Sequence, residues 1–185
     1  MLRQQGVTLL ELLVVIIIST ILIVSAQLLL SPLLKRLESQ RITDEIYQLC
    51  LHSRALAAHM KLPLTLCGSS NGEQCDNNWA EGVLLFIDQN RSHRFEVGET
   101  RLQYRSLQIG SSTLTWKGFG GHTLGIEAFG IPFASNGSFT YCSADKDPKY
   151  SQQVIVSRSG RVRRAPDNNG DGEREAIDGG IINCN

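Results

Sequence analysis

The sequence predicts an α+β fold in which one long amino-terminal helix, half transmembrane and half amphipathic, packs on an antiparallel β-sheet domain. Three observations predict it. A long apolar run comes first, an apolar stripe with helical spacing follows, and short alternating segments separated by turns make up the rest. We accordingly divide the chain into a leader (1–6), a transmembrane helix (7–30) and a domain (31–185) that ends in a tail (165–185).

The amino-terminal run from Val7 to Leu30 contains one charged residue, Glu11, and no Pro or Gly. It exceeds the roughly 20 helical residues that span a bilayer core. The small residue Gly6 precedes the run, so cleavage there would leave the apolar helix on the mature protein, unlike cleavage of a secretory signal. Arg3 is the only charge before the helix, which predicts a cytoplasmic leader and a domain outside.

Beyond the apolar run, the helix is predicted to continue through a kink at Pro32 and to end at Leu62-Pro63. Residues recurring at spacings of three and four draw one mostly apolar stripe down this polar half. They are Ile42, Ile46, Leu49, Ser53, Leu56 and Met60. The stripe predicts packing against a sheet.

Strands are predicted after residue 63, where Gly, Ser, Thr and Asn become frequent. The expected strands are 64–66, 83–87, 101–105, 113–116, 131–133, 139–142, 154–156 and 161–163. Asn136-Gly137 predicts a hairpin between 131–133 and 139–142. Arg158-Ser159-Gly160 predicts a second hairpin between 154–156 and 161–163.

Five cysteines indicate an oxidising compartment. Four of them allow three connectivities. We favour Cys67 with Cys75, which bracket a short loop, and Cys142 with Cys184, which would pin the tail to a strand. Cys50, on the predicted helix, is then the unpaired thiol. The alternative is a set of free thiols.

The leader residues resemble the class III leader of type IV pilins and type II secretion pseudopilins. The resemblance implies that a prepilin peptidase cuts after Gly6 and methylates Val7, which replaces the usual Phe. It also implies that Glu11 pairs with the amino terminus of a neighbouring subunit. A plain membrane anchor with a stray Glu is the alternative.

Three later segments are similar to the FimT/GspH family of minor pilins and minor pseudopilins. They are residues 79–90 with Trp79, Gly82, Phe86 and Asp88, then 136–139, then 159–163. The resemblance implies either a GspH-like role in initiating secretion pseudopili or a FimT-like role in DNA capture during natural transformation. A Gly-Arg-x-Arg pattern is associated with the DNA-binding branch, and Gly160, Arg161 and Arg163 match it.

The basic segment can also be interpreted from its residues. Lys plus Arg equals Asp plus Glu at 18 each, so a charged partner must be met by a local patch. Alternate strand residues share a face, so Arg161 and Arg163 are expected to project together while Val162 enters the core. The expected phosphate-binding set is completed by Arg158, Arg164, Lys146 and Lys149. No aromatic stacking platform is evident, and the alternative is an edge strand protected by charge.

The tail matches calcium-loop spacing, with Asp167, Asn169, Asp171 and Asp178 at loop positions one, three, five and twelve. An ordinary flexible Asn/Asp/Gly tail is the alternative. The histidines are scattered and no CxxC occurs, so the sequence predicts neither zinc nor thioredoxin chemistry. No nucleophile, base or paired-carboxylate arrangement stands out. We therefore expect no enzyme and no cofactor, calcium excepted.

The resulting hypothesis is a minor type IV pilin, anchored in the inner membrane with its domain in the periplasm, that reaches the cell surface in a pilus. Its expected partners are prepilin peptidase, other pilins and double-stranded DNA, bound without sequence preference for uptake by competent cells. The alternative is a GspH-like minor pseudopilin of type II secretion, a structural component that binds no DNA.

Overall fold

The computed structural model describes residue 6 and residues 8–133 and 135–184. Helix α1 (Leu9–Met60) is continuous through Pro32. The residues before Glu38 and those from Glu38 onward form two compact units, so each is described by itself. The first unit carries a segment long and apolar enough to cross a membrane. Its described side chains from Leu9 to Leu34 are exposed, as expected for a lipid-facing helix.

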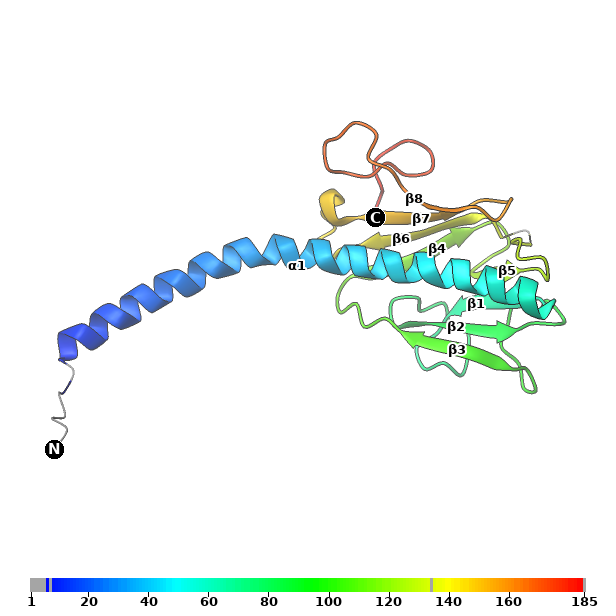
Figure 1. Ribbon diagram of the computed structural model, residues 1–185, viewed down its shortest axis with the longest axis horizontal. Coiled ribbons are helices and arrows are strands. Elements are labelled where there is room, and N and C mark those ends of the chain that lie inside the picture. Colours follow the sequence, from blue (N-terminus) through cyan, green and yellow to red (C-terminus); the bar gives the residue numbers. More distant parts are fainter. Residues whose placement is uncertain (1–5, 7, 134, 185) are drawn as a thin grey trace. The chain divides into compact units, whose positions relative to one another are not determined.

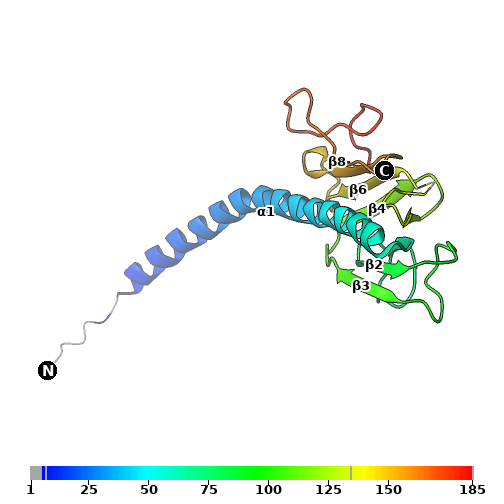
Figure 2. The same ribbon diagram turned by 45° about the vertical axis from the view of Figure 1, so that its right-hand side comes forward.

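The second unit contains the domain half of α1 and two antiparallel sheets (Figures 1 and 2). The first sheet has the order β3-β2-β1-β5, and the second has the order β4-β6-β7-β8. Their bounds are β1 (Leu64–Gly68), β2 (Gly82–Ile87), β3 (Arg101–Ser106), β4 (Thr113–Gly118), β5 (Thr123–Ile126), β6 (Gly137–Cys142), β7 (Gln152–Val156) and β8 (Val162–Arg164). A short 3-10 helix, η1 (Pro148–Tyr150), precedes β7. The α+β class expected from the sequence is confirmed.

The main core lies between α1 and both sheets. The predicted stripe supplies it, because Ile42, Ile46 and Leu49 are buried together with Leu66 of β1 and Val154 of β7. Aromatic rings bind the second sheet into this core: Phe139 contacts Trp79 edge-on with centroids 4.9 Å apart and Trp116 at 4.5 Å. The helix stripe is therefore confirmed as the packing surface of the domain.

Both sheets also bury part of their second face. Cys67, Leu84 and Phe86 form a small cluster on the far side of the first sheet. Ile155 forms another on the far side of the second sheet, with Ala165 and Ile182 of the tail. Burial on two faces explains why 83–87 and 154–156 are continuous apolar runs instead of alternating ones.

The hairpin expected around Asn136-Gly137 is wrong. Gly137 begins β6, which pairs with β4 and β7, and residues 131–133 form no strand. Pro132 makes only an isolated bridge with Ile126, since proline has no N–H for a ladder. Strand β5 was not expected, because Gly125 in its centre and the glycines before it suggest a turn.

Candidate functional site

The leader site begins at Gly6, which is exposed and has no neighbouring atom within 4 Å of the position of an added Cβ. Thr8 precedes the first helical residue, and its Oγ1 accepts a hydrogen bond of 3.3 Å from the backbone N–H of Glu11. Thr8 is thus the N-cap and Glu11 the third helical residue, the spacing of a capping box. Glu11 is exposed in the first turn, where a carboxylate also complements the helix dipole. Val7 and Arg3 lie outside the described residues.

The basic hairpin is formed by β7, β8 and the turn from Ser157 to Arg161. The N–H of Gly160 donates to the carbonyl of Ser157 at 2.9 Å, and the N–H of Ser157 donates to the carbonyl of Arg161 at 2.9 Å. Gly160 has a φ of 83°, a left-handed conformation that favours glycine. The turn presents Arg158 and Arg161 to solvent. Neither guanidinium has an ion pair with a carboxylate in the described part of the chain.

The pairing of β7 with β8 shows on which face of the sheet the remaining hairpin residues lie. Val162 pairs with Val156 and is buried in the main core, as the alternation of side chains predicts. Arg163 pairs with Ile155 and is half-exposed on the opposite face. The expectation that Arg161 and Arg163 share a face is consistent with this register.

Arg164 does not extend that row. It lies on the same face as Val162, toward α1, because side chains alternate along the strand. There its Nη2 is 2.7 Å from Oδ1 of Asp44, and its guanidinium lies 4.8 Å from the ring centroid of Tyr47. Arg164 thus joins the hairpin to the helix, and the prediction that it belongs to one phosphate-binding row is wrong.

Lys146 and Lys149 are exposed, but they lie at the other end of the hairpin. They belong to the connection that follows Cys142, whereas Arg158 and Arg161 follow Val156. The five residues of β7 separate the two ends by roughly 16 Å, at about 3.3 Å per residue. The two lysines, whose spatial position the sequence left open, are therefore separated from the arginines of the turn by the length of a strand.

Helix α1 contributes one further positive charge beside the basic turn, that of Arg54. The Nε of Arg54 donates a 2.6 Å hydrogen bond to the carbonyl of Gly130, in the loop between β5 and β6. A Cβ at Gly160 would lie 2.8 Å from Nη2 of Arg54, so the guanidinium rests directly against the basic turn. No sequence signal identifies Arg54, because it lies about a hundred residues from the turn that it contacts.

The tail carboxylates stabilise turns instead of converging on an ion. Asp167 accepts backbone N–H groups from Gly170 at 2.7 Å and Gly172 at 3.0 Å. Asp178 accepts the N–H of Gly180. Among the described residues, no three His, Cys, Asp or Glu side chains are grouped as metal ligands. The described tail has no helix on either side of Asp167, Asn169, Asp171 and Asp178, so calcium binding by these residues stays a prediction.

Both expected disulfides are present, Cys67–Cys75 and Cys142–Cys184. The second closes the longer loop, with a sequence separation of 42 residues, and fixes the tail beside β6. Cys50 is free and buried in the main core. Burial raises the pKa of its thiol to about 12, so Cys50 stays protonated and unreactive at neutral pH.

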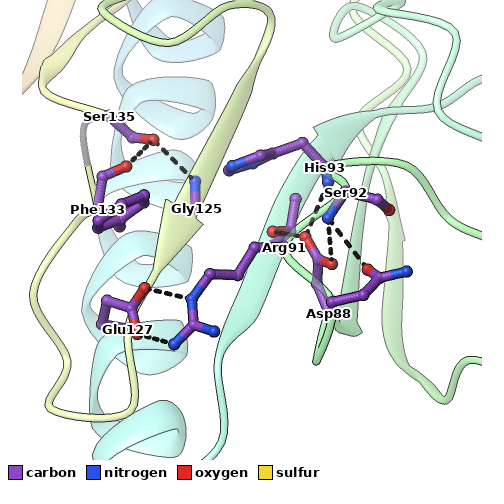
Figure 3. Close-up of polar contacts among 10 residues, drawn as sticks. Asp88, Arg91, Ser92, His93, Gly125, Glu127, Phe133 and Ser135 are labelled. Carbon is purple, nitrogen blue, oxygen red and sulfur yellow. Dashed lines mark hydrogen bonds and ion pairs between the residues drawn. The ribbon is translucent and has the colours of Figure 1, made fainter.

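A polar network around Asp88 follows β2 (Figure 3). The buried carboxylate of Asp88 accepts the hydroxyl of Thr65 at 2.7 Å and the backbone N–H groups of Ser92 and His93 at 3.0 Å. Beside it, Arg91 makes two hydrogen bonds to Glu127, and these hold the pKa of Glu127 below its ordinary value. The Arg91–Glu127 contact attaches the loop that follows β2 to the residue that follows β5.

The comparisons with known proteins agree with this architecture. The family described as type II transport protein GspH matches residues 43–160, more than half of the chain. The prokaryotic N-terminal methylation motif matches residues 1–26, which include Gly6 and Glu11. The GspH match ends at Gly160, so Arg161 and Arg163 lie beyond it. No curated protein matches the chain.

Solved structures share the fold at low sequence identity. The type IV minor pilin FimU of Pseudomonas aeruginosa matches with a TM-score of 0.57 and 16% identity, over 71% of this chain and 90% of that one. The same pilin in another crystal form gives 0.53 and 15%, over 69% and 92%. The minor pseudopilin EpsH from the Type 2 Secretion System of Vibrio cholerae gives 0.51 and 12%, over 72% and 99%.

The methylation motif, an apolar segment long enough to cross a membrane and the helix-on-sheet domain thus occur in one chain, and the domain shares its fold with a type IV minor pilin and a minor pseudopilin. These matches support the role of a type IV pilin or pseudopilin, and families of this kind are structural. The chain belongs to the GspH family of the type IV pilin and pseudopilin superfamily.

Proposed function

We propose that this protein is a minor pilin that binds DNA phosphates through the β7–β8 turn. The observation that carries the proposal is the pair Arg158 and Arg161, both exposed on a hydrogen-bonded turn and both without a carboxylate partner among the described residues. Guanidinium groups offer parallel N–H donors that match phosphate oxygens. Arg54 adds a third positive charge behind Gly160.

The position of the turn suits a partner that is long and uniform in charge. β8 is an edge strand of three residues, so nothing in its sheet covers the turn from that side. The arginines lie on a turn and not on a helix that could read bases in the major groove. Phosphate contacts position a protein on DNA without reading its sequence. Binding is therefore weak and non-specific, with dissociation constants of about 10⁻⁴ to 10⁻⁶ M at physiological salt.

Binding by full-length protein in detergent micelles tests the proposal. Arg158→Gln/Arg161→Gln removes two charges at the turn, and Lys146→Gln/Lys149→Gln removes two at the other end of the hairpin. At 50 mM salt, each lost phosphate contact weakens binding about tenfold, and the log–log salt slope becomes shallower by about 0.9. We expect this for the arginine pair only. Equal losses in the two variants would exclude the turn as the site.

In the same proposal, prepilin peptidase cuts after Gly6, the new amino terminus at Val7 is methylated, and Glu11 pairs with the amino terminus of a neighbour. The domain then faces the periplasm and reaches the cell surface in the filament. Gly6→Ala keeps a small residue and is still cut, whereas Gly6→Lys blocks processing. Glu11→Ala yields a cleaved, inserted protein that enters filaments poorly.

Because Glu11 also occupies the capping position behind Thr8, a second variant separates the two roles. Glu11→Gln keeps a side chain suited to the third position of a capping box and removes the charge, whereas Glu11→Ala removes both. Loss of incorporation in both Glu11→Gln and Glu11→Ala supports charge pairing. Normal incorporation of Glu11→Gln would exclude charge pairing and leave capping as the role of this residue.

The second candidate is a minor pseudopilin of type II secretion without a nucleic-acid role. The family match over residues 43–160, described as type II transport protein GspH, favours it. Deletion of the gene separates the candidates: loss of transformation with intact secretion supports DNA capture, and loss of exported proteins in the medium supports the pseudopilin. Absence of DNA binding at 50 mM salt would also decide for the pseudopilin.

A further inference from the structure

The end of the domain that carries the basic turn also exposes aromatic side chains. Phe129 is 84% exposed and Phe119 is 72% exposed, although the domain has a core that buries other phenylalanines. Phe119 follows β4, and Phe129 lies in the loop between β5 and β6. Figure 1 places this loop and the β7–β8 turn at the same end of the domain. Both aromatic residues are separated from Arg161 by thirty or more positions in the sequence.

Arg54 connects the Phe129 loop to the basic turn. Its Nε donates to the carbonyl of Gly130, the residue next to Phe129. Its guanidinium also lies against Gly160, the residue next to Arg161. The loop itself is a closed turn, since the N–H of Gly130 donates to Glu127 at 2.8 Å and the N–H of Glu127 donates to Ile131 at 2.9 Å. One side chain thus holds an exposed aromatic residue and an exposed arginine at neighbouring points of the surface.

Sheet register places Phe119 at the same end. Gly118 pairs with Gly137, Gly137 pairs with Val156, and Val156 pairs with Val162. Neighbouring strands lie about 4.8 Å apart, so the backbone at Phe119 is on the order of 15 Å from the backbone at Arg161. The N–H of Phe119 donates to the carbonyl of Asn136 at 2.9 Å, which fixes the start of this loop against the strand that follows the Phe129 loop.

We propose that this end of the domain binds single-stranded nucleic acid, with unpaired bases stacking on Phe129 and Phe119 while phosphates contact Arg158 and Arg161. The inference rests on the proposed DNA binding and deepens it by naming the form of DNA. Proteins that hold single strands without sequence preference combine a positively charged surface with exposed aromatic rings. A duplex hides the faces of its bases, so these rings contribute nothing to duplex binding. The expected target is an unpaired end or a melted segment.

The positive charge at this end of the domain favours a nucleic-acid strand as the partner over an apolar protein surface. Three guanidinium groups, those of Arg54, Arg158 and Arg161, lie at the same end of the domain as the two rings, and none of the three has an ion pair with a described residue. A partner that covers the two rings must also neutralise these cations. A nucleic-acid strand supplies a phosphate for every base, so one strand can offer both a negative charge and a base face to this end of the domain.

Fluorescence anisotropy of full-length protein in detergent tests the inference with three probes of equal length: a thymidine single strand, a fully paired duplex and an abasic single strand. We expect the thymidine strand to bind more tightly than the other two. Phe119→Ala and Phe129→Ala should each weaken thymidine binding about tenfold, within the range for one stacked base, without changing the salt slope. Phe129→Trp should restore it. Ile181→Ala, an exposed apolar residue on the tail, is the matched control and should change nothing.

The outcomes of this experiment distinguish the inference from the proposed function on which it rests. Equal binding of all three probes, with phenylalanine variants unchanged and the arginine variant weakened, overturns the stacking role and leaves the phosphate site standing. Absence of binding to every probe overturns both. If Phe119→Ala and Phe129→Ala lower filament incorporation but leave binding of the thymidine strand intact, the surface contacts another subunit and the inference is wrong.

Discussion

The two ends of the sheet β4-β6-β7-β8 differ in how fully their side chains are used inside the domain. At the end nearest Ser39, the Cys142–Cys184 disulfide holds the tail, and the Ser39 hydroxyl donates to the carbonyl of Tyr150. The Tyr141 hydroxyl there donates to Glu38 at 2.8 Å. At the opposite end, Arg158, Arg161, Phe119 and Phe129 project into solvent.

The difference teaches where stability and binding reside in one small domain. The first end joins the helix, the sheet and the tail through covalent and hydrogen-bonded contacts, so its residues are expected to matter for folding. The second end has a hydrogen-bonded backbone, but Arg158 and Arg161 have no ion pair with a described residue and Phe119 and Phe129 are exposed, so these side chains are expected to matter for binding. Changes at the first end should therefore alter the free energy of unfolding, and changes to the exposed side chains of the second end should alter affinity.

The largest expected effect is removal of the Cys142–Cys184 disulfide. Cross-link entropy predicts a loss of about 4 kcal/mol for this closure of 42 residues, against about 2.5 kcal/mol for Cys67–Cys75, which closes 8. Both tryptophans are buried in the domain, so tryptophan fluorescence during denaturation measures its unfolding. Double alanine variants of each pair provide the comparison. A larger loss from the shorter loop would contradict the assignment of the first end as the stabilising one.

DNA affinity of the same disulfide variant sharpens the comparison. Below its unfolding transition, the Cys142→Ala/Cys184→Ala variant should bind DNA as the wild type does, because the basic turn lies at the other end of β7. A large loss of affinity in the folded variant would show that the two ends are coupled.

A smaller effect is expected for Gly160→Ala, which tests the second end. A left-handed φ costs a non-glycine residue roughly 1–2 kcal/mol, and the added methyl group also meets the Arg54 guanidinium. Gly170→Ala is the matched control, because Gly170 has a φ of 77° and open space around it. Gly160→Ala should lower the free energy of unfolding more than Gly170→Ala does. The excess should vanish in an Arg54→Ala background, and its persistence there would refute the packing of Arg54 on the turn.

The dependence of stability on pH reports on Tyr141. Burial, followed by the adjacent Glu38 carboxylate, raises the pKa of the Tyr141 hydroxyl to about 12 from an ordinary value of 10.0. The folded state therefore holds the phenolic proton more tightly than the unfolded state. Its contribution to stability is complete below pH 10 and is lost as the pH rises from 10 to 12. Ultraviolet titration of tyrosinate should show this late step in the wild type and not in Tyr141→Phe.

The smallest effect is expected for the Arg164–Asp44 ion pair. Both side chains are substantially exposed, so the pair contributes at most about 1 kcal/mol. A double-mutant cycle with Arg164→Gln and Asp44→Asn should give a coupling energy of that size at low salt. Arg164→Gln should leave DNA affinity unchanged within twofold, unlike Arg161→Gln. Equal losses of affinity in the two variants would return Arg164 to the binding surface.

Local patterns in the sequence determined the helix, its buried face, the disulfides and the burial of Val162. The uninterrupted apolar run and the spacing of Ile42, Ile46 and Leu49 determined the helix and its buried face, since helical periodicity depends only on nearby residues. The short loop between Cys67 and Cys75 determined one disulfide for the same reason. The pairing of Cys142 with Cys184 followed once Cys67 and Cys75 were paired and Cys50 was placed on the helix as the unpaired thiol. Alternation around Val162 likewise predicted its burial.

Tertiary structure alone decided how these parts meet. The division into two sheets depends on pairings such as β1 with β5 and β4 with β6, whose partners are distant in sequence. Long-range packing also moved Arg164 to the helix and brought Arg54 and Phe129 to the basic turn. Strand length separated Lys146 from Arg158. These outcomes depend on which face of a strand finds a partner and on where each strand ends, and neither is encoded in the residues next to the position concerned.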